Sequence, residues 1–205
     1  MKVSHILFKV NDLEKSVEKF RNSGFNVEYG SKRHPHNALI YFSEGPYIEL
    51  INKVSVSSLT KFFMRLLGKG KVIERIENWG NREEGFFEIC LENYSTNFKE
   101  EEGILKKYEK SYFITKSKRT DPSNRVLKWR LLFPLDLDLP FFMTYFNINP
   151  KPKDFIHPNG TVKIKSVSYG TQANLIPIIK ELCDDETLEL FEGEGVKDVT
   201  YEKEN

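Results

Sequence analysis

The chain opens with short apolar runs of strand-like character, interrupted by one amphipathic helical pattern. Residues 3–10 are rich in β-branched and aromatic side chains and predict a strand. Asn11-Asp12 then supplies an N-cap for a helix that Gly24 ends. Three further extended segments follow between turn-rich stretches, at residues 25–29, 38–43 and 47–51. The first fifty residues therefore predict a βαβββ module.

The same order of elements returns in the middle of the chain and again, shortened, at its end. The second copy consists of a helix at 97–108 and extended segments at 86–91, 112–116, 126–133 and 141–146. The third begins at Thr161 and reads strand, helix and two strands. This degenerate internal repeat predicts an α+β fold of two βαβββ modules, at 1–52 and 84–147, with a truncated βαββ unit at 157–205.

A helical pattern fills the connector at residues 53–83. Its apolar positions fall at helical spacing, with Lys61, Arg65 and Lys69 on the opposite side. These apolar positions are Leu59, Phe62, Phe63, Leu66 and Leu67. The pattern favours a connecting helix packed on the sheet, with an amphipathic membrane-surface helix as the alternative.

Composition limits the classes of function. Hydrophobic residues make up 39% and aromatic residues 13% of the chain, which is enough for a core. Basic and acidic residues nearly balance at 31 and 30, so the long-range field that steers proteins to nucleic acid is missing. The first residues lack the apolar region of a signal peptide, and no stretch is long enough to span a bilayer. We therefore expect a cytoplasmic protein without a nucleic-acid or membrane partner.

The two cysteines, Cys90 and Cys183, lie far apart without CxxC spacing. This spacing argues against a zinc knuckle and against a disulfide scaffold. Both are expected to be small core residues.

Several short motifs occur in an order that is informative as a set. In the first half they are His5, Asn11-Asp12-Leu13, Gly24-Phe25, the turn from Gly30 to His34, Asn37-Ala38-Leu39-Ile40 and Tyr47-Ile48-Glu49-Leu50. In the second half they are the segment from Arg119 to Arg125, Leu127-Lys128-Trp129-Arg130 and Phe133-Pro134. In this order they resemble the glyoxalase-like domain branch of the vicinal oxygen chelate superfamily.

The resemblance implies one domain over residues 1–205, in which the paired modules curve as a mixed sheet around a cup. A small molecule or a metal ion sits inside that cup in such proteins. The sequence agrees with this picture, because a sheet with one helix-covered face leaves its other face free to line a cavity.

In metal-using members of the family, a His from the first strand and a Glu from the fourth strand of each module bind the ion. His5 and Glu49 match the first pair and are the leading catalytic candidates. Aligning the two modules puts Phe86 at the position of His5 and Met143 at that of Glu49, and neither binds a hard divalent ion. We therefore expect no cofactor, with a divalent metal on His5 and Glu49 as the less favoured alternative to a hydrogen-bonded pair.

The turn after residue 30 offers further polar groups. His34 is a candidate general base or third ligand that could reach over the cup mouth, and His36 and Asn37 are candidate ligand-binding residues. The two histidines are equally readable as solvated residues of a polar loop.

Three more side chains are candidate binding residues. Arg119 could hold an anion, Trp129 could form an aromatic wall, and Tyr47 could orient a ligand through its phenol. Trp129 could also be a core residue, and Arg119 could lie on the rim.

These observations predict a glyoxalase-like protein that binds a small organic molecule in its cup, with lyase, isomerase or dioxygenase-type chemistry. The first alternative is a non-catalytic protein that sequesters a drug or metabolite, as bleomycin-resistance proteins of the superfamily do. The second is a partner-binding module that uses the truncated third unit as an interface, for example in a homodimer.

Overall fold

The computed structural model describes residues 1–52, 56–153 and 155–204. The first module consists of β1 (Lys2–Lys9), α1 (Leu13–Asn22), β2 (Glu28–Tyr29), β3 (Asn37–Ile40) and β4 (Tyr47–Ile51). The connector holds α2 (Ser58–Leu66) and α3 (Gly70–Asn81). The second module consists of β5 (Gly85–Asn93), α4 (Lys99–Lys107), β6 (Tyr112–Thr120), β7 (Val126–Pro134) and β8 (Phe141–Thr144). The third unit consists of β9 (Thr161–Thr171), α5 (Ile176–Leu182), β10 (Leu188–Glu192) and β11 (Gly195–Lys203).

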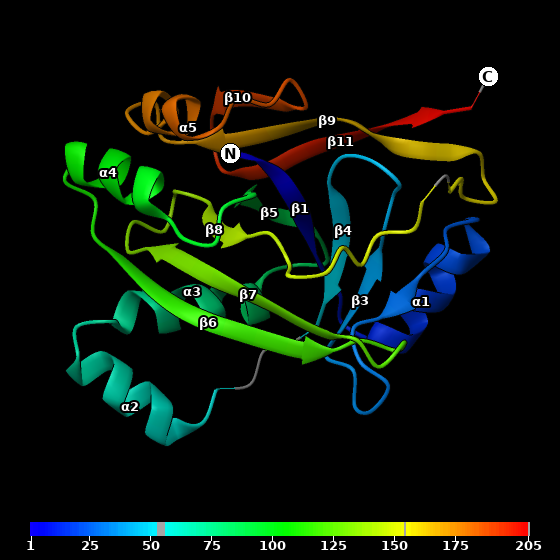
Figure 1. Cartoon of the computed structure of the whole chain (residues 1–205), viewed down its shortest axis with the longest axis horizontal. Helices are drawn as coiled ribbons and strands as arrows, with labels where there is room; N and C mark the ends of the chain where they lie inside the picture. The colour runs from blue at the N-terminus through cyan, green and yellow to red at the C-terminus, as the bar shows by residue number, and fades with distance from the viewer. Residues whose placement is uncertain (53–55, 154, 205) are drawn as a thin grey trace.

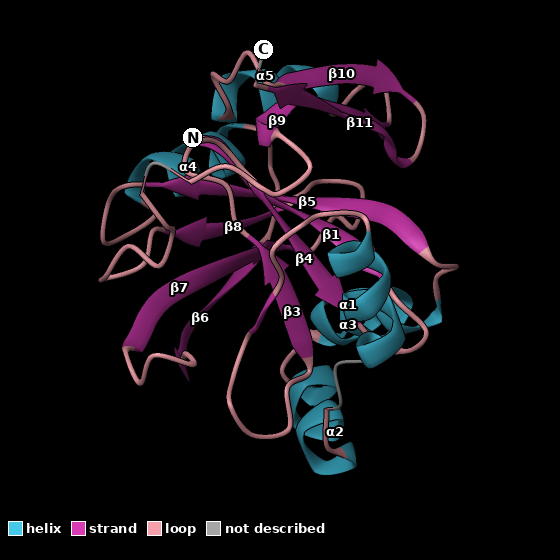
Figure 2. Ribbon diagram, turned by 90° about the vertical axis from the view of Figure 1, so that its right-hand side faces the viewer, coloured by secondary structure: helices cyan, strands magenta, loops and turns pink. Residues whose placement is uncertain are grey.

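The strands of both modules form one curled, eight-stranded sheet in the order β2-β3-β4-β1-β5-β8-β7-β6 (Figures 1 and 2). Strand β1 runs parallel to β4 and antiparallel to β5, and β5 runs parallel to β8. The two modules therefore join through their first strands. This arrangement confirms the predicted α+β fold with paired modules.

The third unit forms a separate three-stranded sheet in the order β10-β9-β11, with α5 beside it (Figure 1). Its β9 pairs in parallel with β10 and antiparallel with β11, as a shortened βαββ copy requires. The predicted truncated unit is therefore present. Among the described residues, no helix combines the length and apolar character needed to cross a bilayer.

The first helix shows how local sequence sets the chain path. The Asp12 side chain accepts a hydrogen bond from the backbone N–H of Lys15 at 3.1 Å and so caps α1. After the helix, Gly24 adopts a φ of +80°, and a Cβ there would lie 2.7 Å from the Asn159 Cβ. Only glycine suits both demands, because the left-handed conformation and the close approach each penalise a side chain.

The outer face of the large sheet carries the main core. Helices α1 and α4 and the third unit cover this face, and side chains such as Ile6, Phe42 and Phe142 are fully buried in it. Each contributes about 1.5–3 kcal/mol through burial. The opposite, concave face, which we call the cup face, packs against α3 through Val72 and Trp79.

Strand β1 contains an irregularity that changes which side chains reach the cup. Simple alternation places Val3 on the same face as His5 and Leu7. The register shifts between Val3 and His5, and Val3 lies in the outer core whereas Leu7 lies in the cup-face cluster. The Ser4 hydroxyl also contacts Met143 of the cup-face cluster. The bulge therefore turns both Ser4 and His5 toward the cup.

The connector differs from the prediction in one respect. Helix α3 packs on the sheet, whereas α2 packs on α3 and has no buried residue. The expectation that the apolar positions of residues 59–67 pack on the sheet is thus wrong. The side chains left exposed are Leu59, Phe62, Phe63, Leu66 and Leu67, with exposures of 50–71%. Residues 53–55 of the predicted connector lie outside the described residues.

This exposure leads to a prediction for stability. Replacing Phe62 or Phe63 by Ser is expected to change the free energy of unfolding by less than about 1 kcal/mol, because surface substitutions remove little packing. Phe142→Ala, at a fully buried position, is the contrast and is expected to cost about 3–5 kcal/mol. Urea denaturation measures both. A loss above about 2 kcal/mol for either surface variant would mean that this helix face is covered in solution.

Candidate functional site

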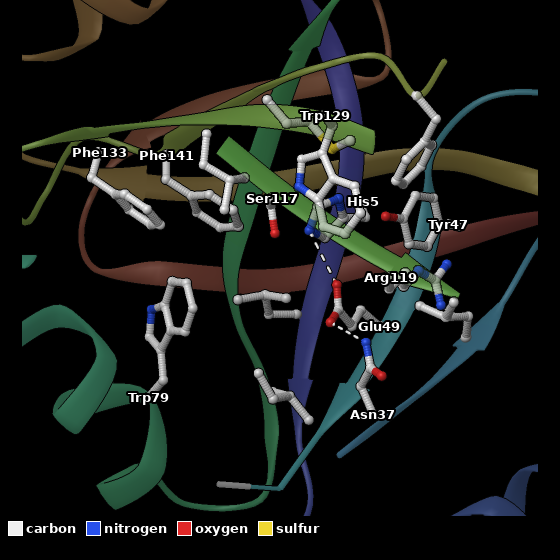
Figure 3. A pocket seen from close by; sticks show the side chains of 16 residues that line it. His5, Asn37, Tyr47, Glu49, Trp79, Ser117, Arg119, Trp129, Phe133 and Phe141 are labelled. Atoms are coloured by element: carbon white, nitrogen blue, oxygen red, sulfur yellow. Dashed lines mark hydrogen bonds and ion pairs between the residues drawn. The ribbon is translucent and has the colours of Figure 1, made fainter. Parts of the chain in front are cut away.

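A cavity of about 280 Å³ lies between the cup face of the sheet and α3. Its polar side chains gather at one end, and Trp79, Phe133 and Phe141 form the other (Figure 3). The polar lining consists of His5, Asn37, Tyr47, Glu49, Ser117 and Arg119, and the remaining lining includes Leu7, Leu39, Ile51, Trp129, Leu131, Met143 and Phe146. The cavity is thus mostly apolar with a few convergent polar groups, which is the usual character of small-molecule sites.

Two polar side chains meet at the centre of this polar end. The His5 Nε2 lies 3.4 Å from a Glu49 carboxylate oxygen, and these side chains retain only 5% and 17% exposure. The Asn37 amide donates a 2.7 Å hydrogen bond to the other Glu49 oxygen. The His5 ring also stacks on Tyr47, with a centroid distance of 4.7 Å and an interplanar angle of 22°. Adjacent parallel strands β1 and β4 thus bring the two predicted catalytic residues together (Figure 3).

A second acidic residue, Glu92, is linked to His5 through the Ser4 hydroxyl. The Ser4 hydroxyl donates a 2.7 Å hydrogen bond to a Glu92 carboxylate oxygen and lies 3.1 Å from the His5 Nδ1. Because the hydroxyl proton is directed to Glu92, the network assigns the imidazole proton to Nδ1. The lone pair of Nε2 then faces Glu49. Sequence reasoning missed Ser4 and Glu92, because the bulge that aligns Ser4 with His5 leaves no readable periodicity.

Burial sets the protonation of this network. Removal from water, reinforced by the positive charges of Lys151 and Arg119, lowers the pKa of His5 to about 3. Desolvation raises the pKa of Glu49 above its usual range, although the Asn37 hydrogen bond and Arg119 oppose it. Burial likewise raises the pKa of Glu92. The imidazole is therefore neutral near pH 7, and Glu49 protonates more readily than an exposed carboxylate.

The lowered pKa of His5 predicts how the stability of the protein depends on pH. Between pH 6.5 and about 3 the unfolded chain binds a proton at His5 that the folded chain does not, so this contribution to stability falls as pH falls. From pH 6.5 to 5 we expect wild type to lose about 2 kcal/mol more than His5→Gln. NMR provides the second readout. The His5 ring signals, assigned with the variant, should keep their neutral positions down to pH 5, and a midpoint near 6.5 would contradict the burial argument.

Three other predicted residues also line the cavity. The Arg119 guanidinium donates hydrogen bonds to the Gly30 carbonyl at 2.8 Å and to the Tyr41 hydroxyl at 2.7 Å, so it is held in place with further N–H groups to offer. Burial raises the pKa of Tyr47 well above its usual value, and the phenol stays neutral. Trp129 packs edge-on against Phe146 at 5.2 Å and forms an aromatic wall.

The loop histidines lie elsewhere. His34 and His36 are exposed and line a separate surface groove beside Asn11 and Pro122. Neither belongs to the lining of the cup. His34 has a φ of 47°, so its backbone adopts the left-handed conformation. The expected reach of these side chains over the cup mouth is therefore not what the structure shows, whereas their neighbour Asn37 points inward.

The strand registers give the second-module counterparts of His5 and Glu49. Tyr47 lies opposite His5, and Phe141 lies opposite Cys90 in the corresponding pair. Cys90, also directly across from His5, is therefore its counterpart. The expected counterpart, Phe86, pairs instead with Phe8 and packs against the outer core.

These positions decide whether a family-type divalent metal fits. By the same register Met143 corresponds to Glu49. Burial raises the pKa of the Cys90 thiol well above its usual value, and its Sγ faces the Leu91 carbonyl. A neutral thiol and a thioether are poor ligands for a hard ion. Among the described residues no cluster of three His, Cys, Asp or Glu side chains could hold a metal. The residues present thus do not fit the four-ligand centre.

Comparison with known proteins agrees with this fold. A family model, the Glyoxalase-like domain, matches residues 3–181. Among solved structures, the fold is similar to the Mn(II)-bound glyoxalase from Novosphingobium aromaticivorans, with a TM-score of 0.57 and 11% identity over 98% of this chain and 64% of that one. This chain thus spans less than two thirds of that glyoxalase. A xylose isomerase-like TIM barrel/4-hydroxyphenylpyruvate dioxygenase fusion protein also matches, with a TM-score of 0.48 and 10% identity over 98% of this chain and 36% of that one.

No curated protein matches the sequence. At such low identities the structural likeness concerns the fold alone. Paired βαβββ modules around a cup define a protein of the vicinal oxygen chelate fold. The family match covers most of the chain, so this protein belongs to the Glyoxalase-like domain family.

Proposed function

We propose that the cup binds a small, largely apolar organic molecule and that His5 and Glu49 transfer protons on it, as a lyase or isomerase does. The observation that carries this proposal is the neutral imidazole, whose Nε2 faces Glu49 at the polar end of an aromatic cavity. Titratable groups with shifted pKa values in a concave apolar site are characteristic of acid–base catalysis.

The cavity limits the size and polarity of the molecule. A volume of about 280 Å³ is at the small end of ligand sites and suits a single substituted ring or a short branched chain. The aromatic end receives the apolar part. A carbonyl or carboxylate oxygen is best placed beside Arg119 and Tyr47, where a fixed cation and a neutral phenol can donate to it.

The proton-transfer roles follow from the assigned hydrogen bonds. Ser4 and Glu92 hold the proton on His5 Nδ1, so Nε2 can accept a proton from a carbon next to the ligand's carbonyl group. Glu49, in its protonated form, can return a proton to a different atom of the ligand. His5 then takes one proton from the ligand and Glu49 gives one proton to it. The net result is an isomerisation or an elimination. A ring-cleaving dioxygenase reaction is less well supported, because the second module does not supply the usual ligands.

A second candidate function is sequestration of a drug or metabolite without catalysis. It is favoured by the aromatic lining and by Cys90 and Met143 at the positions where family enzymes carry ligands. Binding alone needs no proton-transfer group. This candidate shares the cup and the ligand class with the first and differs only in turnover.

A thermal-shift screen of small ring-containing acids and ketones tests whether the cup is a binding site. Ligands that bind the native state raise the melting temperature by mass action. Ser117→Trp places a large ring on the cup face of β6 and is expected to abolish the shift. Thr120→Trp, exposed on the other face of the same strand, is the matched control and should keep it. Equal shifts in both variants would place the ligand outside the cup.

A further inference from the structure

The outer face of the β6–β7 hairpin, opposite the cup face, carries a group of four basic side chains. They are Lys116 and Lys118 on β6 and Lys128 and Arg130 on β7. We call this group the basic quartet. The strand register places Lys116 directly opposite Arg130 and Lys118 directly opposite Lys128. Within the part of the chain that the structure describes, none of the four forms an ion pair with an acidic side chain.

This arrangement costs stability. Side chains directly opposite each other on antiparallel strands have Cβ atoms about 4.5–5.5 Å apart, and like charges there repel. Lysines on an edge strand are a common protection against aggregation, which accounts for β6 at the end of the sheet. It does not account for Lys128 and Arg130, because their backbone N–H groups donate to the Asn147 and Thr144 side chains, so this side of β7 is not an open edge. A bound anion would account for all four.

Three members of the quartet, Lys116, Lys118 and Lys128, are exposed and Arg130 is half-buried, because the covering helix stops short of them. On the same outer face, Ile114 and Leu132 pack into the main core together with Leu105 of α4. Beyond them, β6 and β7 extend well past α4 toward the loop that joins them (Figures 1 and 2). The four cations stand on this uncovered part of the hairpin.

The quartet forms one wall of a cleft of about 580 Å³. The opposite walls come from residues 94–96 after β5 and from residues 144–147 at the end of β8 and after it. The Tyr94 side chain is 72% exposed and lies against Tyr145, with ring centroids 5.1 Å apart. An exposed aromatic ring thus stands beside four cations. Such a ring can stack on a planar heterocycle, and the cations can hold phosphate oxygens.

Arg130 is the half-buried member of the quartet. Its Nε lies buried with no hydrogen-bond partner among the described residues, although the residue lines the cleft. The buried Nε is closed to a ligand, but the guanidinium has further N–H groups, and its fork of donors is suited to phosphate.

We propose that this cleft binds a nucleoside diphosphate, with its phosphates on the basic quartet and its base against Tyr94. Four cations match a ligand with two or three negative charges. The cleft volume suits one nucleotide, and the overall charge of +1 lacks the field that favours a long polyanion. The proposal does not rest on the proton-transfer role of the cup, and the two cavities share Ser117, Trp129 and Phe146 in their linings.

Titration with ADP at low salt, followed by calorimetry, tests the proposal. Lys128→Gln and Arg130→Gln are each expected to weaken binding about tenfold, the effect of one charge-assisted hydrogen bond. Tyr94→Ala is expected to weaken ADP binding by a similar factor and to leave inorganic pyrophosphate unaffected. Lys165→Gln, which removes an exposed charge from β9, is the control and should bind as wild type does.

The same variants provide a readout of stability. Because each removes one member of an opposed like-charge pair, Lys128→Gln and Arg130→Gln should melt at or above the wild-type temperature. A marked fall would mean that the charges serve the fold, and it would overturn the proposal. Absence of ADP binding, or binding unchanged by both variants, would also overturn it. Tighter binding of a single-stranded oligonucleotide than of ADP would reassign the cleft to nucleic acid and refute the small-molecule ligand.

Discussion

Replacing Arg75 by Ala is expected to lower the free energy of unfolding by about 3–5 kcal/mol. The guanidinium of Arg75 on α3 lies 2.9 Å from the Glu88 carboxylate on β5, and the two side chains retain 2% and 9% exposure. Removing the cation leaves a buried carboxylate that still accepts a hydrogen bond from the Tyr169 hydroxyl but has lost its buried counter-ion. The large loss reflects this uncompensated charge.

The deficit of Arg75→Ala should depend on pH. Burial raises the pKa of Glu88, and the loss of Arg75 removes the charge that opposes this rise. A carboxyl with a raised pKa in the fold costs stability as pH rises, because the folded chain holds a proton that the unfolded chain releases. Urea denaturation should therefore show a smaller deficit at pH 5 than at pH 8. A deficit independent of pH would contradict this cause.

An exposed ion pair supplies the control. Arg82 pairs with Glu194 at 3.0 Å, with side-chain exposures of 40% and 75%. Arg82→Ala is expected to cost less than about 1 kcal/mol, because water solvates both charges. A loss comparable to that of Arg75→Ala would show that burial is not the deciding factor.

The position of Arg75 links stability to the cup. Besides Glu88, it donates hydrogen bonds to the carbonyls of Asp136 and Leu139, in the loop that leads to β8. Helix α3 carries Trp79, and β8 carries Phe141, both of which line the cavity. One buried cation thus fixes the helix and the strand that form the apolar end of the candidate site.

The order of elements was readable from the sequence because each strand and helix has its own local signal. The Asp12 cap and Gly24 bound α1 as predicted, and the apolar runs became strands of the large sheet. The fate of α2 was not readable. An amphipathic pattern shows that a helix has an apolar face, but not which surface covers that face.

The candidate site was readable only in its first-module half. His5 and Glu49 lie on neighbouring parallel strands, so motif position and alternation suffice to bring them together. The bulge at Ser4 and the register of β5 were not readable, since a shift of one residue in a strand leaves no trace in periodicity. Ser4, Cys90 and Glu92 were therefore missed as neighbours of His5.

Glu49→Gln is expected to reduce turnover by about 10²–10⁴-fold while changing ligand affinity by less than about tenfold. Glutamine keeps the size of the side chain, and its carbonyl can still accept the Asn37 hydrogen bond. Its amide carries no acidic proton, however, so the variant cannot return a proton to the ligand as the protonated Glu49 carboxyl does in the proposed reaction. The ligand is one found by the thermal-shift screen, with binding and turnover measured separately.

Glu189→Gln, which removes an exposed carboxylate from β10 of the small sheet, is the matched control and should keep both binding and turnover. Loss of turnover with retained binding in Glu49→Gln favours the enzyme. If wild type binds the ligand without turnover and Glu49→Gln binds equally well, the proton-transfer role is refuted and sequestration remains. A loss of affinity equal to the loss of turnover would make Glu49 a binding group. Because a cup that only binds has no need of a neutral imidazole facing a carboxyl, the ratio of the two losses separates the two functions.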